Sequence, residues 1–126
     1  MTVSILLVDD SKMMRKIIAK ELSTILGQNE LKLTEADSGE KALEYLQTFS
    51  FDVVFLDLTM PETTGYDVLE SIRERGIQAN IIVLTADIQP EAEKRVRELG
   101  AVDYIRKERP LDTDAITKAL KGLELL

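Results

Sequence analysis

The stretch Val53-Val54-Phe55-Leu56-Asp57-Leu58-Thr59-Met60-Pro61 decides the fold that we predict. Four apolar residues lead without polar alternation into one carboxylate, which is typical of a strand covered on both faces. Pro61 cannot continue a central strand, so the strand must end before it. Asp57 therefore lies at the carboxyl end of a buried strand, where open α/β sheets carry their chemistry. The plainer alternative is that Asp57 only ends the strand or satisfies nearby backbone groups.

The composition bounds the classes of function. The chain has 126 residues, 44% of them hydrophobic, which fits one domain, residues 1–126, with a sizeable core. We expect a cytoplasmic protein, because no apolar run has the length of a membrane span and no signal peptide opens the sequence. With no cysteine and no histidine, disulfides, thiolate chemistry and histidine-based catalysis on this chain are excluded. The net charge of −7 argues against nucleic acid as a direct partner.

Strand and helix patterns alternate along the chain. Apolar or alternating runs predict five strands, at Val3–Val8, Leu31–Ala36, Phe51–Leu56, Asn80–Leu84 and Val102–Arg106. A helix is expected after each strand, with its start at Ser11, Asp37, Thr63 or Thr64, Pro90 and Asp112. For the second helix we expect Asp37 as the cap, Glu40 three residues later, and Phe49 on the inner face with Ala42, Leu43 and Leu46.

Strict alternation of this kind predicts a parallel sheet with helices on both faces, joined by right-handed crossovers. The most apolar strands, Val3–Val8, Phe51–Leu56 and Asn80–Leu84, should be interior, and the alternating Leu31–Ala36 should be an edge. The order 2-1-3-4-5, which is taken from known flavodoxin-like folds, satisfies both conditions. The predicted fold is therefore an α/β domain of the (βα)5 flavodoxin-like type.

Polar side chains follow the strands at the carboxyl edge of this sheet. Asp9 and Asp10 follow the first strand, Asp57 the third, Thr85 the fourth and Lys107 the fifth. Converging carboxylates repel one another, and Mg²⁺ suits a site of oxygen ligands without nitrogen or sulfur. A carboxylate nucleophile, a metal and two donors together suit phosphoryl transfer. Taken singly, each residue has a plainer explanation, such as a helix cap, a strand residue or a solvated lysine.

The motifs resemble the receiver domain of two-component response regulators, of the stand-alone chemotaxis-regulator (CheY-like) type. The resemblance covers essentially the whole chain and rests on four stretches: Ile5-Leu6-Leu7-Val8-Asp9-Asp10-Ser11 with Arg15, Asp57-Leu58-Thr59-Met60-Pro61 with Gly65 and Leu69, Leu84-Thr85-Ala86, and Gly100-Ala101 with Tyr104 and Lys107.

The resemblance implies a role for each residue at the carboxyl edge. Asp57 would be the phosphoacceptor, receiving a phosphoryl group from a histidine of a sensor kinase or of a histidine phosphotransfer protein. Asp10 would bind Mg²⁺ directly and Asp9 through water, with Asp57 and the Thr59 carbonyl as further ligands. Lys107 would pair with a phosphoryl oxygen.

The resemblance also implies a switch. Thr85 would move toward the phosphoryl group, and Tyr104 would rotate inward and couple the site to a surface of helix four, strand five and helix five that binds a downstream partner. Without the family, Tyr104 is an ordinary strand aromatic. Thr59 and Asp87 occupy positions that tune the lifetime of the phosphate. We expect a monomer or weak dimer that catalyses only its own phosphorylation and dephosphorylation.

One segment departs from the family pattern. The family lysine is followed at once by a cis proline, whereas Lys107 is followed by Glu108, Arg109 and Pro110. We expect Lys107 rather than Arg109 at the site, because its spacing from Tyr104 is set by the strand. A trans Lys107–Glu108 bond is the default, and the cis bond has either moved to Arg109–Pro110 or been lost.

Other functions remain open from the residues. A phosphohydrolase with an aspartyl nucleophile would need a second aspartate at the position of Thr59. A flavin carrier would need a loop that binds phosphate after the first strand, where Asp9 and Asp10 have the wrong charge. A pseudo-receiver that binds partners without phosphorylation typically loses acidic residues, and all of them are present here.

Overall fold

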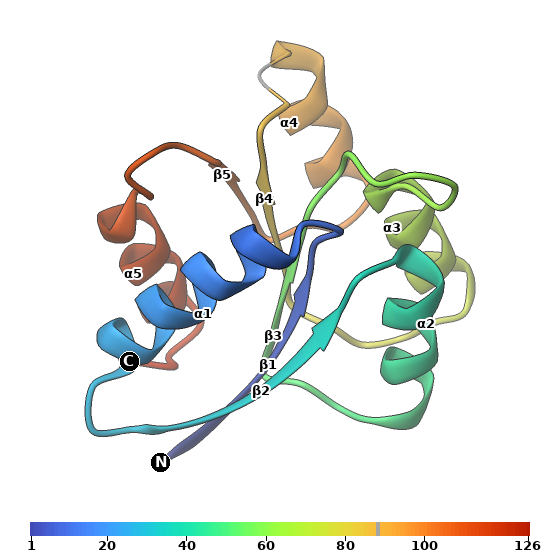
Figure 1. The fold of residues 1–126 in the computed structure, drawn as a ribbon. Coiled ribbons are helices and arrows are strands. Elements are labelled where there is room, and N and C mark those ends of the chain that lie inside the picture. The colour runs from blue at the N-terminus through green and yellow to red at the C-terminus, as the bar shows by residue number, and fades with distance from the viewer. Residues whose placement is uncertain (88) are drawn as a thin grey trace.

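The computed structural model describes residues 1–87 and 89–126. Within this part of the chain, strands and helices alternate from one end to the other (Figure 1). Their bounds are β1 (Thr2–Val8), α1 (Lys12–Leu26), β2 (Glu30–Ala36), α2 (Gly39–Thr48), β3 (Val53–Leu56), α3 (Gly65–Glu74), β4 (Ile81–Thr85), α4 (Pro90–Glu98), β5 (Asp103–Arg106) and α5 (Thr113–Gly122).

The sheet has the predicted order, β2-β1-β3-β4-β5, and every pair of neighbouring strands is parallel. The apolar strands β1, β3 and β4 are interior, and the alternating strand β2 is an edge, as predicted. In the register of the sheet, Val8 lies between Ala36 and Leu56. The last residues of β1 and β3 are therefore neighbours, and the chain leaves them toward the same edge.

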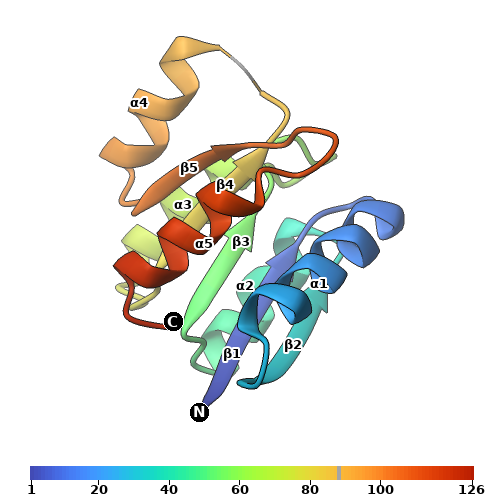
Figure 2. The same cartoon turned by 90° about the vertical axis from the view of Figure 1, so that its left-hand side faces the viewer.

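Helices cover both faces of the sheet. Figures 1 and 2 show α1 and α5 on one face and α2, α3 and α4 on the other. Along β1, Ile5 and Leu7 pack in the first layer, whereas Leu6 and Val8 pack in the second. This arrangement explains why β1 is apolar from Ile5 to Val8, since successive side chains point to opposite faces and both faces are buried. None of the helices in the described part of the chain combines the length and apolar character needed to span a bilayer.

The helix starts agree with the predictions except at α2. Ser11, Thr64 and Asp112 cap α1, α3 and α5 through their side chains, as expected. The prediction of Asp37 as the cap of α2 is wrong, because the side chain of Ser38 accepts the hydrogen bond from the Lys41 amide. Both residue types are good caps, and the helix begins one residue later than the pattern indicated.

The end of α2 also differs from the prediction. Phe49 lies just past the helix, in extended backbone, and 59% of its surface is exposed. It therefore does not belong to the inner face, which Ala42, Leu43 and Leu46 form. The strand β3 begins at Val53, two residues after the predicted start at Phe51.

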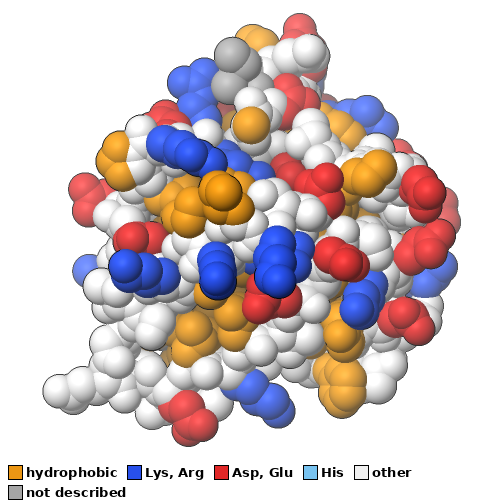
Figure 3. Space-filling model, in the orientation of Figure 1, with side chains coloured by type: hydrophobic (Ala, Val, Ile, Leu, Met, Phe, Trp, Pro, Cys, Tyr) orange, Lys and Arg blue, Asp and Glu red, His pale blue; other side chains and the backbone are white. Residues whose placement is uncertain are grey.

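Charge is unevenly distributed over the surface. Figure 3 shows Lys and Arg side chains over α1 and acidic side chains gathered over α2 and α3. The helix α1 has one acidic residue, Glu21, against four basic ones: Lys12, Arg15, Lys16 and Lys20. The negative net charge is thus concentrated away from α1.

Candidate functional site

The Asp57 side chain lies directly after β3, at the carboxyl edge of the sheet, and is only 3% exposed. Its amide donates to the carbonyl of Val8, which continues the pairing of β3 with β1 by one residue (3.0 Å). Because all four residues of β3 are buried, the strand fixes the place at which the carboxylate emerges. The amide of Thr59 donates to Asp57 Oδ1 at 3.3 Å, and its hydroxyl lies 3.4 Å from the same oxygen.

Asp9 and Asp10 bring two further carboxylates to Asp57. One oxygen from each of these three residues lies within 4.8 Å of the others. Asp9 is 2% exposed and is oriented by the Ser11 amide, which donates to its Oδ1 at 2.9 Å, whereas Asp10 is exposed. Arg15 donates to the backbone carbonyl of Asp9 at 2.7 Å and fixes the turn after β1. The predicted convergence of the three aspartates at the end of β1 and β3 is thus present.

These carboxylates fit a divalent cation. The donors are hard oxygens, two of the three carboxylates are buried, and their mutual distances allow one ion to contact all of them. Mg²⁺ prefers such oxygen ligands and keeps several waters, which the exposed Asp10 side would allow. Its binding by Asp9, Asp10, Asp57 and the Thr59 carbonyl stays a prediction.

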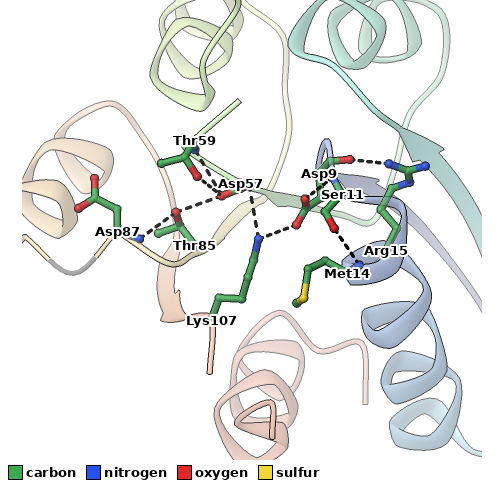
Figure 4. Close-up of polar contacts among 9 residues, drawn as sticks. All are labelled: Asp9, Ser11, Met14, Arg15, Asp57, Thr59, Thr85, Asp87 and Lys107. Atoms are coloured by element: carbon green, nitrogen blue, oxygen red, sulfur yellow. Dashed lines mark hydrogen bonds and ion pairs between the residues drawn. The ribbon is translucent and has the colours of Figure 1, made fainter. Parts of the chain in front are cut away.

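Lys107 brings a positive charge to the carboxylates. Its Nζ lies 2.6 Å from Asp9 Oδ2 and 3.4 Å from Asp57 Oδ2, and its side chain is 13% exposed (Figure 4). The backbone positions it, because its amide donates to the carbonyl of Thr85 at 2.7 Å, one residue past the end of β5. Arg109, the second candidate, instead contacts Met13 Sδ at 3.9 Å. Within the described chain, the single cis bond is Arg109–Pro110, one of the two outcomes that the sequence left open.

Thr85 places a hydroxyl against the same carboxylate from β4. It is fully buried, and its Oγ1 donates to Asp57 Oδ1 at 3.1 Å. The same Oγ1 accepts from the Asp87 amide at 3.3 Å, so a chain of two hydrogen bonds runs from the loop after β4 to Asp57 (Figure 4). The Tyr104 hydroxyl, from β5, donates to the Asp87 carbonyl. Thr85, Asp87 and Tyr104 are therefore connected to one another in the unphosphorylated chain.

The environment of Asp57 raises the pKa of its carboxyl. Burial raises the pKa of this carboxyl above its ordinary value of 3.8; Lys107 partly offsets the effect, and Asp9 adds to it. Hydrogen bonds from Thr59 and Thr85 stabilise the ionised form but do not outweigh the burial. An additional cation beside Asp57 would lower this pKa and free the carboxylate to act as a nucleophile.

Sequence reasoning missed Tyr66, which contacts this loop, and Arg95, which contacts Tyr66. Tyr66, the second residue of α3, has its hydroxyl 3.4 Å from Asp87 Oδ2, and Arg95 lies over its ring with the guanidinium carbon 4.3 Å from the ring centroid. Neither residue belongs to a strand end, and the contact depends on how α3 and α4 pack. The presence of Tyr directly after Gly65 was the one available signal, and it does not by itself point to a partner.

A separate hollow lies at the opposite edge of the sheet. It has a volume of about 380 Å³ and is lined by the ends of α3 and α4 and the residues before β4, among them Arg73, Ile77 and Glu98. None of the three clustered carboxylates lines it. This hollow is therefore separate from the cluster of carboxylates at the carboxyl edge.

Comparisons with known proteins agree on one family. The sequence profile described as "Response regulator receiver domain" matches residues 5–121. The chain is 33% identical to the chemotaxis protein CheY of Halobacterium salinarum over 123 residues, which covers 95% of this chain and 98% of that protein. It is 35% identical to CheY of Bacillus subtilis over 117 residues, covering 92% of each chain.

Other relatives are longer than this chain. The transcriptional regulatory protein DltR of Streptococcus agalactiae is 33% identical over 117 residues, and the match spans 93% of this chain but 50% of DltR. The chain thus spans about half the length of several relatives that it matches. Among solved structures, the chemotaxis protein CheY4 of Vibrio cholerae is similar with a TM-score of 0.81 at 26% identity, covering 98% of this chain and 99% of that one.

Proposed function

The chain belongs to the response regulator receiver family, and we propose that it is a phosphorylation switch in which Asp57 accepts a phosphoryl group. The general function of the family is phosphorylation-dependent signalling rather than the turnover of a substrate. The observation that carries the assignment to Asp57 is the surrounding geometry: two aspartates, Lys107 and the Thr85 hydroxyl all lie at this one buried carboxylate.

The donor in this proposal is a phosphohistidine of a sensor kinase or of a histidine phosphotransfer protein. An oxygen of the Asp57 carboxylate attacks phosphorus, the bond between phosphorus and the imidazole nitrogen breaks, and the imidazole leaves with the bonding electrons. A bound Mg²⁺ would neutralise charge between the carboxylates and the phosphoryl oxygens. Lys107, already 3.4 Å from Asp57 Oδ2, would pair with a phosphoryl oxygen.

The switch would run from Thr85 to Tyr104. Thr85 donates to Asp57 in the unmodified chain, and after transfer the same hydroxyl would donate to a phosphoryl oxygen. Tyr104 already contacts the carbonyl of Asp87. Phosphorylation would then stabilise an arrangement that the unmodified chain can reach, and the surface of α4, β5 and α5 would bind a downstream partner in that arrangement.

The phosphohydrolase alternative is less well supported. The position two residues after Asp57 is Thr59, whose hydroxyl lies 3.4 Å from Asp57 Oδ1 and has no acidity suited to protonating a leaving group. The pseudo-receiver alternative is also less well supported. The polar residues expected of a receiver that is phosphorylated are all present in one cluster: Asp9, Asp10, Asp57, Thr85 and Lys107.

Acetyl phosphate with Mg²⁺ tests the proposal without knowledge of the kinase. Intact-protein mass spectrometry should show the addition of one phosphoryl group to the wild-type chain and none to Asp57→Asn. A wild-type chain that gains no mass, or an Asp57→Asn variant that gains the same mass, would contradict the proposal.

A further inference from the structure

Asp87 connects the loop after β4 to three other parts of the fold. Its amide donates to Thr85 Oγ1 at 3.3 Å, and its carbonyl accepts from the Tyr104 hydroxyl. Its carboxylate has two partners of its own: Oδ1 accepts from the Gln89 amide at 3.1 Å, and Oδ2 accepts from the Tyr66 hydroxyl at 3.4 Å. The backbone of Asp87 thus belongs to the switch, and its side chain is bonded to α3.

The Tyr66 ring is also contacted by α4, through Arg95. The guanidinium carbon of Arg95 lies 4.3 Å from the ring centroid, a distance at which a cation is attracted to the face of an aromatic ring. Arg95 in turn pairs with Glu70 of α3 at 3.4 Å. The phenol is therefore restrained at its ring as well as at its hydroxyl. Burial and the neighbouring Asp87 carboxylate raise the pKa of Tyr66, so its hydroxyl keeps its proton and can donate at neutral pH.

The direction of the Asp87 carboxylate matters for charge at the site. Figure 4 shows this side chain pointing away from Asp57, with Thr85 between the two. A phosphoryl group on Asp57 would add negative charge beside Asp9 and Asp10, and a further carboxylate near it would be repulsive. Asp87 is two residues from Thr85, so a side chain released from α3 would be free to approach that group.

We propose that Tyr66 is a positioning residue, whose hydroxyl keeps the Asp87 carboxylate on the α3 side of the β4–α4 loop and thereby favours a phosphoryl group on Asp57. The inference rests on the proposed function and adds to it a residue outside the catalytic cluster. Tyr66 acts through Asp87 and contacts neither the phosphoryl group nor a metal ligand. Loss of its hydroxyl would free Oδ2 of the carboxylate from α3, with the Gln89 amide still bonded to Oδ1, while leaving the ring under Arg95.

Tyr66→Phe tests the inference with Mg²⁺ and beryllofluoride, a small anion that takes the place of a phosphoryl group on a carboxylate. Calorimetric titration should show beryllofluoride binding weakened by about 2- to 10-fold, the range expected for one hydrogen bond. Affinity for Mg²⁺ alone should not change, because the metal ligands are untouched. Tyr45→Phe is the matched control, since it removes the same hydroxyl from a partly buried tyrosine of α2 and should leave both affinities as in the wild type.

A double-mutant cycle separates positioning from packing. In an Asp87→Ala background the tethered carboxylate is absent, so adding Tyr66→Phe should have no further effect on beryllofluoride affinity. An unchanged affinity in Tyr66→Phe alone, or a loss that persists in the Asp87→Ala background, would overturn the role of Tyr66 while the wild-type binding leaves the proposed function in place. A wild-type chain that neither binds beryllofluoride nor gains a phosphoryl group would overturn both.

Discussion

Asp57 destabilises the metal-free fold when it is ionised. Its pKa is raised from 3.8 by burial, so the folded chain binds this proton more tightly than the unfolded chain does. Stability must then fall as the pH rises from the unfolded value through the raised folded value, because in that interval the folded state carries more protons. Burial of this carboxyl therefore lowers the stability of the fold at any pH well above 3.8.

Asp57→Asn should therefore stabilise the metal-free protein at pH 7. Each 1 kcal/mol gained by removing the cost of the buried charge should raise Tm by about 4 °C in a domain of this size. The gain should shrink as the pH falls from the raised folded pKa toward about 4, and it should be absent below that, where the wild-type carboxyl is protonated in both states. Asp37→Asn, an exposed aspartate, is the control and should shift Tm little. Thermal unfolding followed across pH gives the comparison, and a gain that does not depend on pH would contradict this account of Asp57.

Substitution of Lys107 should distinguish binding of the metal from recognition of the phosphoryl group. Its Nζ lies between Asp9 and Asp57, where it competes with any second cation and would later face the phosphoryl oxygens. Lys107→Ala should bind Mg²⁺ at least as tightly as the wild type, but beryllofluoride about 10- to 100-fold more weakly, as expected for a lost charged hydrogen bond.

Arg109→Ala provides the comparison for Lys107, because Arg109 contacts Met13 rather than the carboxylates. Both affinities should stay as in the wild type when measured by the same titrations. If Arg109→Ala rather than Lys107→Ala weakened beryllofluoride binding, Arg109 and not Lys107 would take the role of the family lysine.

At the scale of the elements, the β3–α3 connection requires a glycine. A Cβ on Gly65, the first residue of α3, would lie 2.3 Å from the Asp57 carbonyl oxygen and 2.7 Å from Leu58 Cα. Both neighbours are backbone atoms of the segment that carries the phosphoacceptor. The first residue of α3 therefore packs directly against the backbone of Asp57 and Leu58.

Gly65→Ala should reduce the free energy of unfolding by about 1–3 kcal/mol, the usual effect of overpacking. It should also weaken Mg²⁺ binding, because the carboxylate is displaced. Gly122→Ala is the matched control: it lies in α5 with no atom within 4 Å of the added Cβ, and it should be neutral or stabilising by up to about 1 kcal/mol. Urea unfolding with and without Mg²⁺ measures both effects, and equal stability of the two variants would refute the close approach.

The elements also show what the sequence could and could not predict. Apolar runs marked where β1 and β3 end, and the strand order taken from known flavodoxin-like folds then predicted the convergence of Asp9, Asp10 and Asp57. The place of Lys107 at the site could be predicted from its spacing after Tyr104 in the strand. In the structure its amide donates to the Thr85 carbonyl, so Lys107 continues the pairing of β5 with β4 by one residue. The cap of α2 was misplaced because Asp37 and Ser38 are adjacent and both suit the position.

The role of Tyr66 could not be read from the sequence for a different reason. Its contacts join α3 to the loop after β4 and to α4, segments separated by 21 residues or more in the chain. No period or motif encodes such a contact, because it depends on the angle at which two helices pack on the sheet. Local patterns thus predicted the polar residues at the carboxyl edge but not the contact of Tyr66 with Asp87.

At the scale of the whole molecule, the acidic cluster makes the fold sensitive to divalent cations. The chain carries 23 Asp and Glu against 16 Lys and Arg, a net charge of −7, and three of these carboxylates converge on one point. A ligand that binds only the folded state stabilises it by mass action, by about 2.7 kcal/mol at one hundred times its dissociation constant. A cation at this point would relieve repulsion that no described residue other than Lys107 offsets by an ion pair with these aspartates.

Mg²⁺ should therefore raise the Tm of the wild-type chain in a saturable way. The shift should be largely lost in Asp10→Asn, because an exposed ligand is removed without disturbing the buried hydrogen bonds of Asp9 and Asp57. Differential scanning calorimetry at constant ionic strength, with K⁺ replacing the charge of Mg²⁺, separates the site from general screening. A shift of equal size in both proteins would place the effect on the surface charge instead.

The position of the phosphoryl group is the central claim, and chemical trapping tests it most directly. After treatment with acetyl phosphate and Mg²⁺, borohydride reduces an aspartyl phosphate to homoserine, and peptide mass spectrometry then locates the reduced residue. We predict homoserine at position 57 and unaltered aspartate at positions 9, 10 and 87. Homoserine at any of those three positions with Asp57 intact, or no reduced residue at all, would contradict the claim.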